Sequence, residues 1–104
     1  MEHLAYRYSV DRRARGERLL AIVGVVASGN LEVLVERVLP DTDCEVVVNT
    51  AVRGFADVWK AVIGDFVAQA RTGGLRMSIN DGGARPDTVS LRLAQAVASI
   101  AEDA

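Results

Sequence analysis

Few side chains in this sequence stand in a pattern that could do chemistry. The single histidine, His3, has no nucleophile or ligand set spaced to work with it, and we expect an exposed strand residue. The single cysteine, Cys44, begins an apolar stretch, which favours a small buried residue over a reactive thiolate. Lys60 is the only lysine and falls in a predicted helix, so no lysine-bearing phosphate loop is expected. We therefore predict no catalytic residue and no metal site.

Two further stretches allow a functional interpretation but favour a structural one. Arg12, Arg13 and Arg15 could form a phosphate-contact patch, yet a solvated basic loop is the simpler interpretation. Asp81–Gly83 could be an anion-binding turn, but these residues are also typical of a plain turn between a strand and a helix. An autonomous enzyme is not expected from such a set.

One hydroxyl is placed where another protein could reach it. The segment Val23–Glu36 is predicted to be a long hairpin whose tip is Ser28–Asn30. A three-residue hairpin loop usually needs one residue with positive φ, and Gly29 or Asn30 can supply it. Ser28 is then either a small polar turn residue or a hydroxyl displayed to a modifying enzyme, and spacing alone leaves both interpretations open.

Two periodicities predict the elements that position this hairpin. Period-2 alternation and short apolar runs predict strands over residues 3–10, 18–27, 31–38, 44–49 and 75–80. Apolar steps of three and four predict helices over about 52–70 and 86–100. We therefore predict an α+β fold with a mainly antiparallel sheet of about five strands and two helices packed on it, in the order β-β-β-β-α-β-α.

Several residues within these elements carry more specific expectations. The stretch Leu19–Ala27 is apolar at both parities, which predicts a strand covered on both faces by protein or by a partner. Gly24 inside it indicates a bulge or a close approach of backbone. Trp59 and Phe66 recur at helical spacing, so we expect core residues rather than a cofactor site.

The overall composition excludes several classes of function. The 104 residues are 50% hydrophobic and 25% charged, which is the balance of one folded domain spanning 1–104 and not of a disordered chain. A net charge of −2 lacks the basic excess of a nucleic-acid binder. The longest apolar run is about half the ~20 residues that a membrane helix needs, and no signal peptide is recognised. With one cysteine, a soluble, cytoplasmic protein is expected.

Three stretches of the sequence together resemble a known family. They are the Ser28–Gly29 tip with Gly24 before it and Leu31–Leu34 after it, the segment Leu75–Pro86, and the closing Val89–Leu93. This combination resembles the acyl carrier subunit, or delta subunit, of malonate decarboxylases, over nearly the whole chain. It is similar, more remotely, to the carrier (gamma) chain of citrate lyase.

The resemblance implies a function for the hairpin. It implies a phosphoribosyl-dephospho-coenzyme A group attached through a phosphodiester to Ser28, with Gly29 and Asn30 shaping the display; Asn30 stands where the family pattern has Asp. The chain would be a non-catalytic carrier of acetyl and malonyl thioesters in a hetero-oligomer. Its implied partners are the acyl-transferase and decarboxylase subunits and a prosthetic-group transferase, with no nucleic acid and no membrane.

Two alternatives remain open at the level of the sequence. Phosphopantetheine acyl carrier proteins are acidic helical bundles with an Asp-Ser-Leu site, and the nearest match here is Val89–Leu91 in a strand-rich chain. The other alternative is a non-catalytic regulatory or assembly domain of a cytoplasmic complex, without a covalent cofactor. The intact mass after expression beside the modifying enzymes separates the three.

Overall fold

The computed structural model describes residues 1–25 and 28–102, with backbone alone for residues 25, 28 and 29. It contains five strands and two helices in the predicted order. Their bounds are β1 (Glu2–Ser9), β2 (Leu20–Val25), β3 (Ser28–Arg37), β4 (Asp43–Thr50), α1 (Ala56–Gln69), β5 (Leu75–Asp81) and α2 (Pro86–Ile100).

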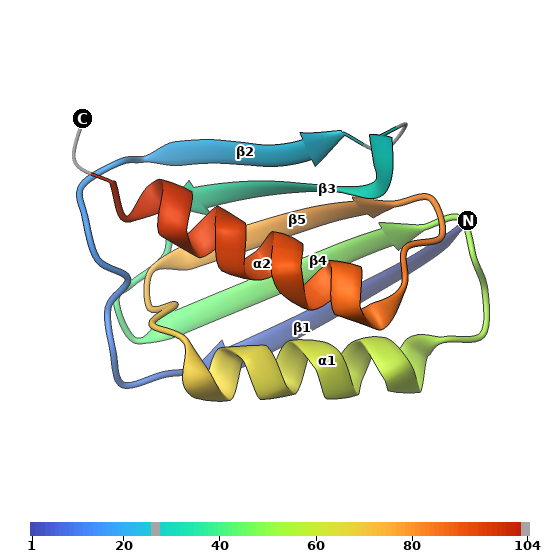
Figure 1. Ribbon diagram of the computed structural model, residues 1–104. Helices are drawn as coiled ribbons and strands as arrows, with labels where there is room; N and C mark the ends of the chain where they lie inside the picture. Colours follow the sequence, from blue (N-terminus) through green and yellow to red (C-terminus); the bar gives the residue numbers. More distant parts are fainter. Residues whose placement is uncertain (26–27, 103–104) are drawn as a thin grey trace.

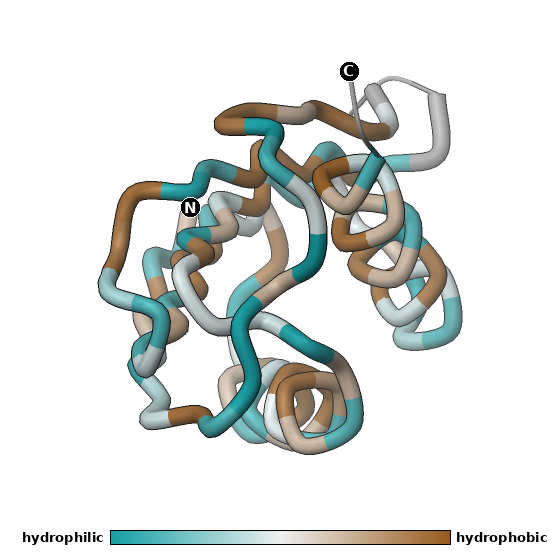
Figure 2. Tube along the Cα trace, turned by 90° about the vertical axis from the view of Figure 1, so that its left-hand side faces the viewer, coloured by the Kyte–Doolittle hydropathy of each residue, from teal (hydrophilic) through white to brown (hydrophobic). Residues whose placement is uncertain are grey.

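The strands form one mixed sheet in the order β1-β4-β5-β3-β2. Three neighbouring pairs are antiparallel, and β4 and β5 are parallel because α1 connects them as a crossover. Figure 1 shows α1 and α2 on the same face of the sheet. Figure 2, turned by 90° about the vertical axis, looks at the molecule from the left-hand side of Figure 1, so that α1 is seen nearly end-on. The predicted fold class is therefore confirmed. None of the helices in the described part of the chain is long and apolar enough to cross a membrane.

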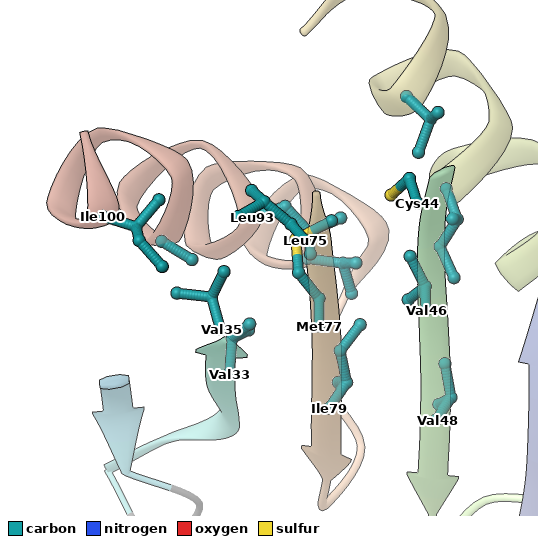
Figure 3. Close-up of a cluster of buried hydrophobic side chains, with 14 of the residues drawn as sticks. Val33, Val35, Cys44, Val46, Val48, Leu75, Met77, Ile79, Leu93 and Ile100 are labelled. Atoms are coloured by element: carbon teal, nitrogen blue, oxygen red, sulfur yellow. The ribbon is translucent and has the colours of Figure 1, made fainter. Parts of the chain in front are cut away.

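The core lies between the sheet and the two helices. Side chains alternate along a strand, so one parity of each central strand is buried: Val33 and Val35 in β3, and Val46 and Val48 in β4. Figure 3 shows these valines with the other labelled core residues, Cys44, Leu75, Met77, Ile79, Leu93 and Ile100. Cys44 is fully buried, as predicted, and burial raises the pKa of its thiol.

The opposite face of the sheet carries no helix in the described structure, which changes the interpretation of the second strand. Ala21 is buried under the helices, whereas Leu20 and Ile22 point the other way and are 57% and 59% exposed. Within the described residues, this strand is therefore covered on one face only. Cover of its other face by a partner stays a prediction.

The first helix begins later than its apolar pattern predicts. The expected start was about Val52, but α1 starts at Ala56 and the residues before it form a loop. Gly54 has φ +92° there, which lies outside the helical region and interrupts the helix before Phe55. The loop leaves Val52 and Phe55 beside the helix. Trp59 is buried and Phe66 packs on the core, as predicted.

Candidate functional site

The hairpin that carries Ser28 is built differently from the predicted three-residue tip. Ser28 is the first residue of β3 and pairs with Val25, the last residue of β2. The connection between them is residues 26–27, which lie outside the described residues. The prediction that Ser28–Asn30 is itself the turn is wrong, because the strand pairing extends beyond the point where glycine and asparagine interrupt the apolar pattern.

An irregularity in the pairing shapes the base of this hairpin. Val23 pairs with Val33 and Val25 with Ser28, so the four residues 29–32 lie opposite the single residue Gly24. Gly24 has φ +76°, and a Cβ there would collide with the carbonyl oxygen of Leu31. The bulge and the close backbone approach predicted for Gly24 are both confirmed.

Asn30 is the residue at which the hairpin separates from the rest of the sheet. It has φ +61°, a left-handed conformation that asparagine tolerates better than most residues, so one of the two candidates named for positive φ does adopt it. Its carbonyl accepts a hydrogen bond from the Gly82 amide at 2.8 Å, and regular pairing with β5 begins only at Leu31 with Asp81. The backbone at Ser28 therefore lies beyond the end of β5, supported by β2.

One cation lies against the hairpin, and sequence reasoning missed it. Arg92 of α2 places its Nε 3.1 Å and its Cδ 3.3 Å from the position that a Cβ on Gly24 would take. Its Nη1 donates to Gln95 Oε1 at 2.8 Å. Its Nε is buried and has no hydrogen-bond acceptor among the described residues. Arg92 lies three residues after the buried Val89, and nothing in the sequence marks it, because a charged residue beside an apolar helical stripe normally lies in solvent.

The guanidinium of Arg92 beside the bulge places a positive charge with a free N–H donor among the described residues at this end of the molecule. A buried N–H without an acceptor carries a desolvation cost of about 1–3 kcal/mol. An anionic oxygen brought to the hairpin would remove that cost through a charge-assisted hydrogen bond. The bulge at Gly24 leaves room for the guanidinium where a side chain would stand. The arrangement therefore suits an anion brought beside the bulge at Gly24.

Most of the remaining residues singled out from the sequence have structural partners. His3 contacts Asn49 on the uncovered face of the sheet. These two residues lie in β1 and β4, at the edge of the sheet opposite the β2–β3 hairpin. In the basic loop, Arg12 donates to the carbonyl of Gln69, and Arg13 donates to nearby carbonyls, so these arginines hold the loop in place. Arg15 is exposed at its surface.

The turn after β5 is the plain strand-to-helix turn that was expected. Asp81 is 6% exposed, and its Oδ1 accepts the amide of Ala84 at 2.7 Å. Its Oδ2 accepts the hydroxyl of Thr50 at 2.8 Å. The carboxylate thus uses a turn amide that an anion would need, and its own charge opposes anion binding there.

Comparison with known proteins places this fold and hairpin in context. The class is an open-faced α+β sandwich that presents a serine-bearing hairpin. A chain of the crystal structure of a Pseudomonas malonate decarboxylase hetero-tetramer in complex with malonate matches it with a TM-score of 0.83 and 35% identity, over 96% of this chain and 99% of that chain.

Sequence relatives give the family. The model of the family "Malonate decarboxylase delta subunit" matches residues 19–100. The malonate decarboxylase acyl carrier protein of Bradyrhizobium diazoefficiens is 68% identical over 99% of this chain and 98% of its own length. That of Xanthomonas euvesicatoria is 54% identical over 93% and 92%. The chain belongs to the malonate decarboxylase delta subunit family, and the resemblance found in the sequence is confirmed.

Proposed function

We propose that this protein is the acyl carrier subunit of a malonate decarboxylase and carries a phosphoribosyl-dephospho-coenzyme A group on Ser28. The observation that carries the proposal is the hairpin: Ser28 starts β3 beyond the end of β5, in a chain 68% identical to a relative named as such a carrier. Ser28 Oγ becomes one ester oxygen of the phosphodiester. Gly29 and Asn30 shape the display of that oxygen. The chain itself is a carrier and not a catalytic subunit.

The residues around the hairpin fit an anionic group of this kind. The buried Nε of Arg92 has no acceptor in the described structure, and it lies beside the bulge at Gly24. A phosphate oxygen of the attached group is a suitable acceptor for a guanidinium N–H. We therefore assign Arg92 to hold the phosphodiester end of the group. The bulge would keep that end near α2 and leave the remainder of the arm outside the sheet.

The chemistry of decarboxylation explains why such a carrier is useful. When bound, the group supplies a thiol whose acyl thioester has a neutral carbonyl able to accept the charge left on carbon as an enolate. The chain contributes positioning: it holds the arm at one end of a rigid sheet. A tethered arm also raises the local concentration of the acyl group at partner sites. The arm carries acetyl and malonyl in turn.

The uncovered sheet face supports a place in a hetero-oligomer. Leu20 and Ile22 are largely exposed on edge strand β2, and Leu34 lies beside Ile22 in the register. Exposed neighbouring apolar side chains of this kind mark interaction surfaces. We propose that acyl-transferase or decarboxylase subunits cover this face. The hetero-tetrameric assembly of the structural relative supports other subunits as partners. We also propose a cytoplasmic protein with one domain spanning residues 1–104.

Intact-mass measurement tests the attachment directly. The protein is produced together with its prosthetic-group transferase, and the expected result is a mass increase equal to the phosphoribosyl-dephospho-coenzyme A group. Ser28→Ala should abolish the increase, whereas Ser90→Ala, on the exposed side of α2, should keep it. An increase that survives in Ser28→Ala overturns the assignment. A protein without any increase that still joins the complex supports the alternative of an assembly domain without a cofactor.

A further inference from the structure

An apolar groove lies between the first turns of the two helices. It has a volume of about 280 Å³. Its apolar walls come from the loop before α1, from α1 and from the start of α2, and they include Val52, Phe55, Val58, Trp59, Pro86 and Val89. None of the described residues fills it.

The rim of the groove exposes large apolar side chains that a closed core would bury. Phe55 is 49% exposed and Val58 is 42% exposed. Gly54, at φ +92°, precedes the helix, and Phe55 follows as its N-cap residue, whose carbonyl accepts a hydrogen bond from the Trp59 amide at 2.9 Å. Apolar surface gathered in a concave site favours an apolar ligand over water.

The floor of the groove carries a carboxylate in a fixed position. Asp81 and Thr50 line the groove, and they are joined by the hydrogen bond from the threonine hydroxyl. Because Ala84 also donates to Asp81, both carboxylate oxygens already have protein donors. The groove therefore offers apolar contacts and a carboxylate whose two oxygens already accept hydrogen bonds from the protein.

The groove and the Ser28 hairpin share one end of the molecule. The amide of Gly82 donates to the carbonyl of Asn30 at the base of the hairpin, and the next residue, Gly83, lines the groove. Figure 1 shows the β2–β3 hairpin and the beginnings of α1 and α2 at this same end. A long flexible arm that starts at Ser28 can thus turn along the β5–α2 loop into the groove.

We propose that this groove is a resting site for the acetyl-pantetheine end of the arm, an inference that rests on the proposed function. The acetyl thioester is neutral and small, so it matches the apolar walls. A malonyl thioester ends in a carboxylate, which would lose its hydration in the groove and lie near Asp81. The groove therefore shelters the acetylated arm, and the malonyl-loaded arm stays available to the decarboxylase.

A titration in trans tests the groove without any attached group. Apo protein labelled with 15N is titrated with S-acetyl-pantetheine and, separately, with S-malonyl-pantetheine, while Trp59 fluorescence and the amide shifts of Val58 and Gly83 are followed. The acetyl compound should perturb all three signals. The malonyl compound should bind roughly tenfold more weakly, as expected for one poorly solvated charge. An equal or stronger response to the malonyl compound overturns the proposal.

Variants with a matched control locate the effect in the groove. Val58→Glu places a charge on the rim, and Ala84→Trp fills the space; both should reduce acetyl-pantetheine binding at least tenfold. Leu91→Glu is the control, because Leu91 is 55% exposed on α2 and does not line the groove. Circular dichroism checks that each variant is folded. Unchanged binding in both folded groove variants contradicts the proposal.

The loaded protein separates failure of the groove from failure of the proposed function. When Ser28 carries the acetylated arm, the Val58 and Gly83 amides should shift from their apo positions, and malonylation should return them towards those positions. A mass increase at Ser28 with no change at these amides, and no binding in trans, overturns the groove alone. Binding in trans without any modification of Ser28 overturns the carrier function and leaves the groove.

Discussion

The side chain of Arg37, the last residue of β3, donates from Nη2 to the carbonyl of Ile100, the last residue of α2, at 3.2 Å. The same guanidinium donates to the carbonyls of Ala14 at 2.9 Å, Arg15 at 2.8 Å and Arg18 at 2.9 Å. One cation therefore joins the β1–β2 loop, a central strand and the end of a helix, at the end of the sheet opposite Ser28. Burial of the guanidinium, together with the nearby charge of Arg13, lowers the pKa of Arg37.

Arg37→Lys is expected to reduce the free energy of unfolding by about 2–4 kcal/mol, because an ammonium cannot reproduce the planar set of donors. Urea denaturation followed by circular dichroism measures the change. Arg7→Lys is the matched control: Arg7 is 53% exposed and pairs with Asp43 and Glu45 at the surface, so its replacement should leave the free energy of unfolding almost unchanged. Equal losses in the two variants would show that the Arg37 contacts carry no special stability.

Arg92→Gln removes the guanidinium that we assign as a hydrogen-bond donor to the phosphate of the prosthetic group. The substitution is expected to slow the transfer of this group to Ser28 without lowering the melting temperature. The guanidinium Nε has no acceptor in the described protein, so folding loses little when it is removed. The initial rate of the mass increase gives the first readout, and thermal unfolding gives the second. Arg15→Gln, at the opposite end of the sheet, should leave both values unchanged. A melting temperature that falls while the rate stays constant would assign Arg92 to structure alone.

Substitutions at Asn30 separate the effect of backbone conformation from the effect of charge on the modification of Ser28. Asn30→Val forces a β-branched residue to φ +61°, at a strain of about 1–3 kcal/mol, and should distort the hairpin and slow modification of Ser28. Asn30→Gly and Asn30→Asp keep residues that tolerate this conformation, and the aspartate also restores the residue of the family pattern. Both should be modified at the parental rate or faster. Parental modification of Asn30→Val would mean that the hairpin does not need this conformation.

The alkaline stability of the protein should depend on Cys44. Burial raises the pKa of its thiol above that of the unfolded chain, so folding favours the protonated form. This contribution is complete below the unfolded pKa, about 8.5, and is lost as the pH rises towards the folded pKa. Urea titrations between pH 8 and 10 should show stability falling in the parent and falling less in Cys44→Ala. A parent and variant with identical pH dependence would exclude a role for this thiol.

A single charged substitution can test whether the uncovered sheet face is the docking surface for partner subunits. Ile22→Glu should prevent elution with the decarboxylase subunits in size-exclusion chromatography, because a buried unpaired carboxylate opposes association. The isolated protein should fold normally, since Ile22 is 59% exposed. Val38→Glu, at an exposed apolar residue outside the strands, is the control and should still assemble. Assembly of both variants would move the docking site to another face.

The sequence was most informative where the apolar pattern is local. The alternation in Leu75–Asp81 and in Asp43–Thr50 follows from side chains that face one layer of helices, so the strands were found nearly at their true bounds. The sheet order could not be predicted in the same way, because the pairing of β1 with β4 joins segments far apart in the chain. The start of α1 was misplaced because an apolar spacing continues through Gly54, where the backbone cannot be helical.

The position of the candidate site residues was harder to predict than their types. Spacing left the role of Ser28 open and only the family resemblance singled it out, while its place depends on the irregular pairing opposite Gly24, because a strand pattern does not reveal how many residues a bulge accommodates. Arg92 was missed because a charged residue beside a helical stripe normally lies in solvent. Only the approach of α2 to β2 and β3 turns it towards the hairpin.

The irregular pairing at Gly24 also makes the edge of the sheet at β2 less prone to aggregation. β2 is an edge strand, and a long regular edge with exposed apolar side chains can recruit a strand from another molecule and start aggregation. Beyond Val23 the ladder is broken, so only the short part of β2 from Leu20 to Val23 offers regular spacing. A foreign strand that docked there could not extend along the hairpin to Ser28. The irregularity at Gly24 therefore limits how far a foreign strand can pair along β2, and it opposes aggregation through this edge.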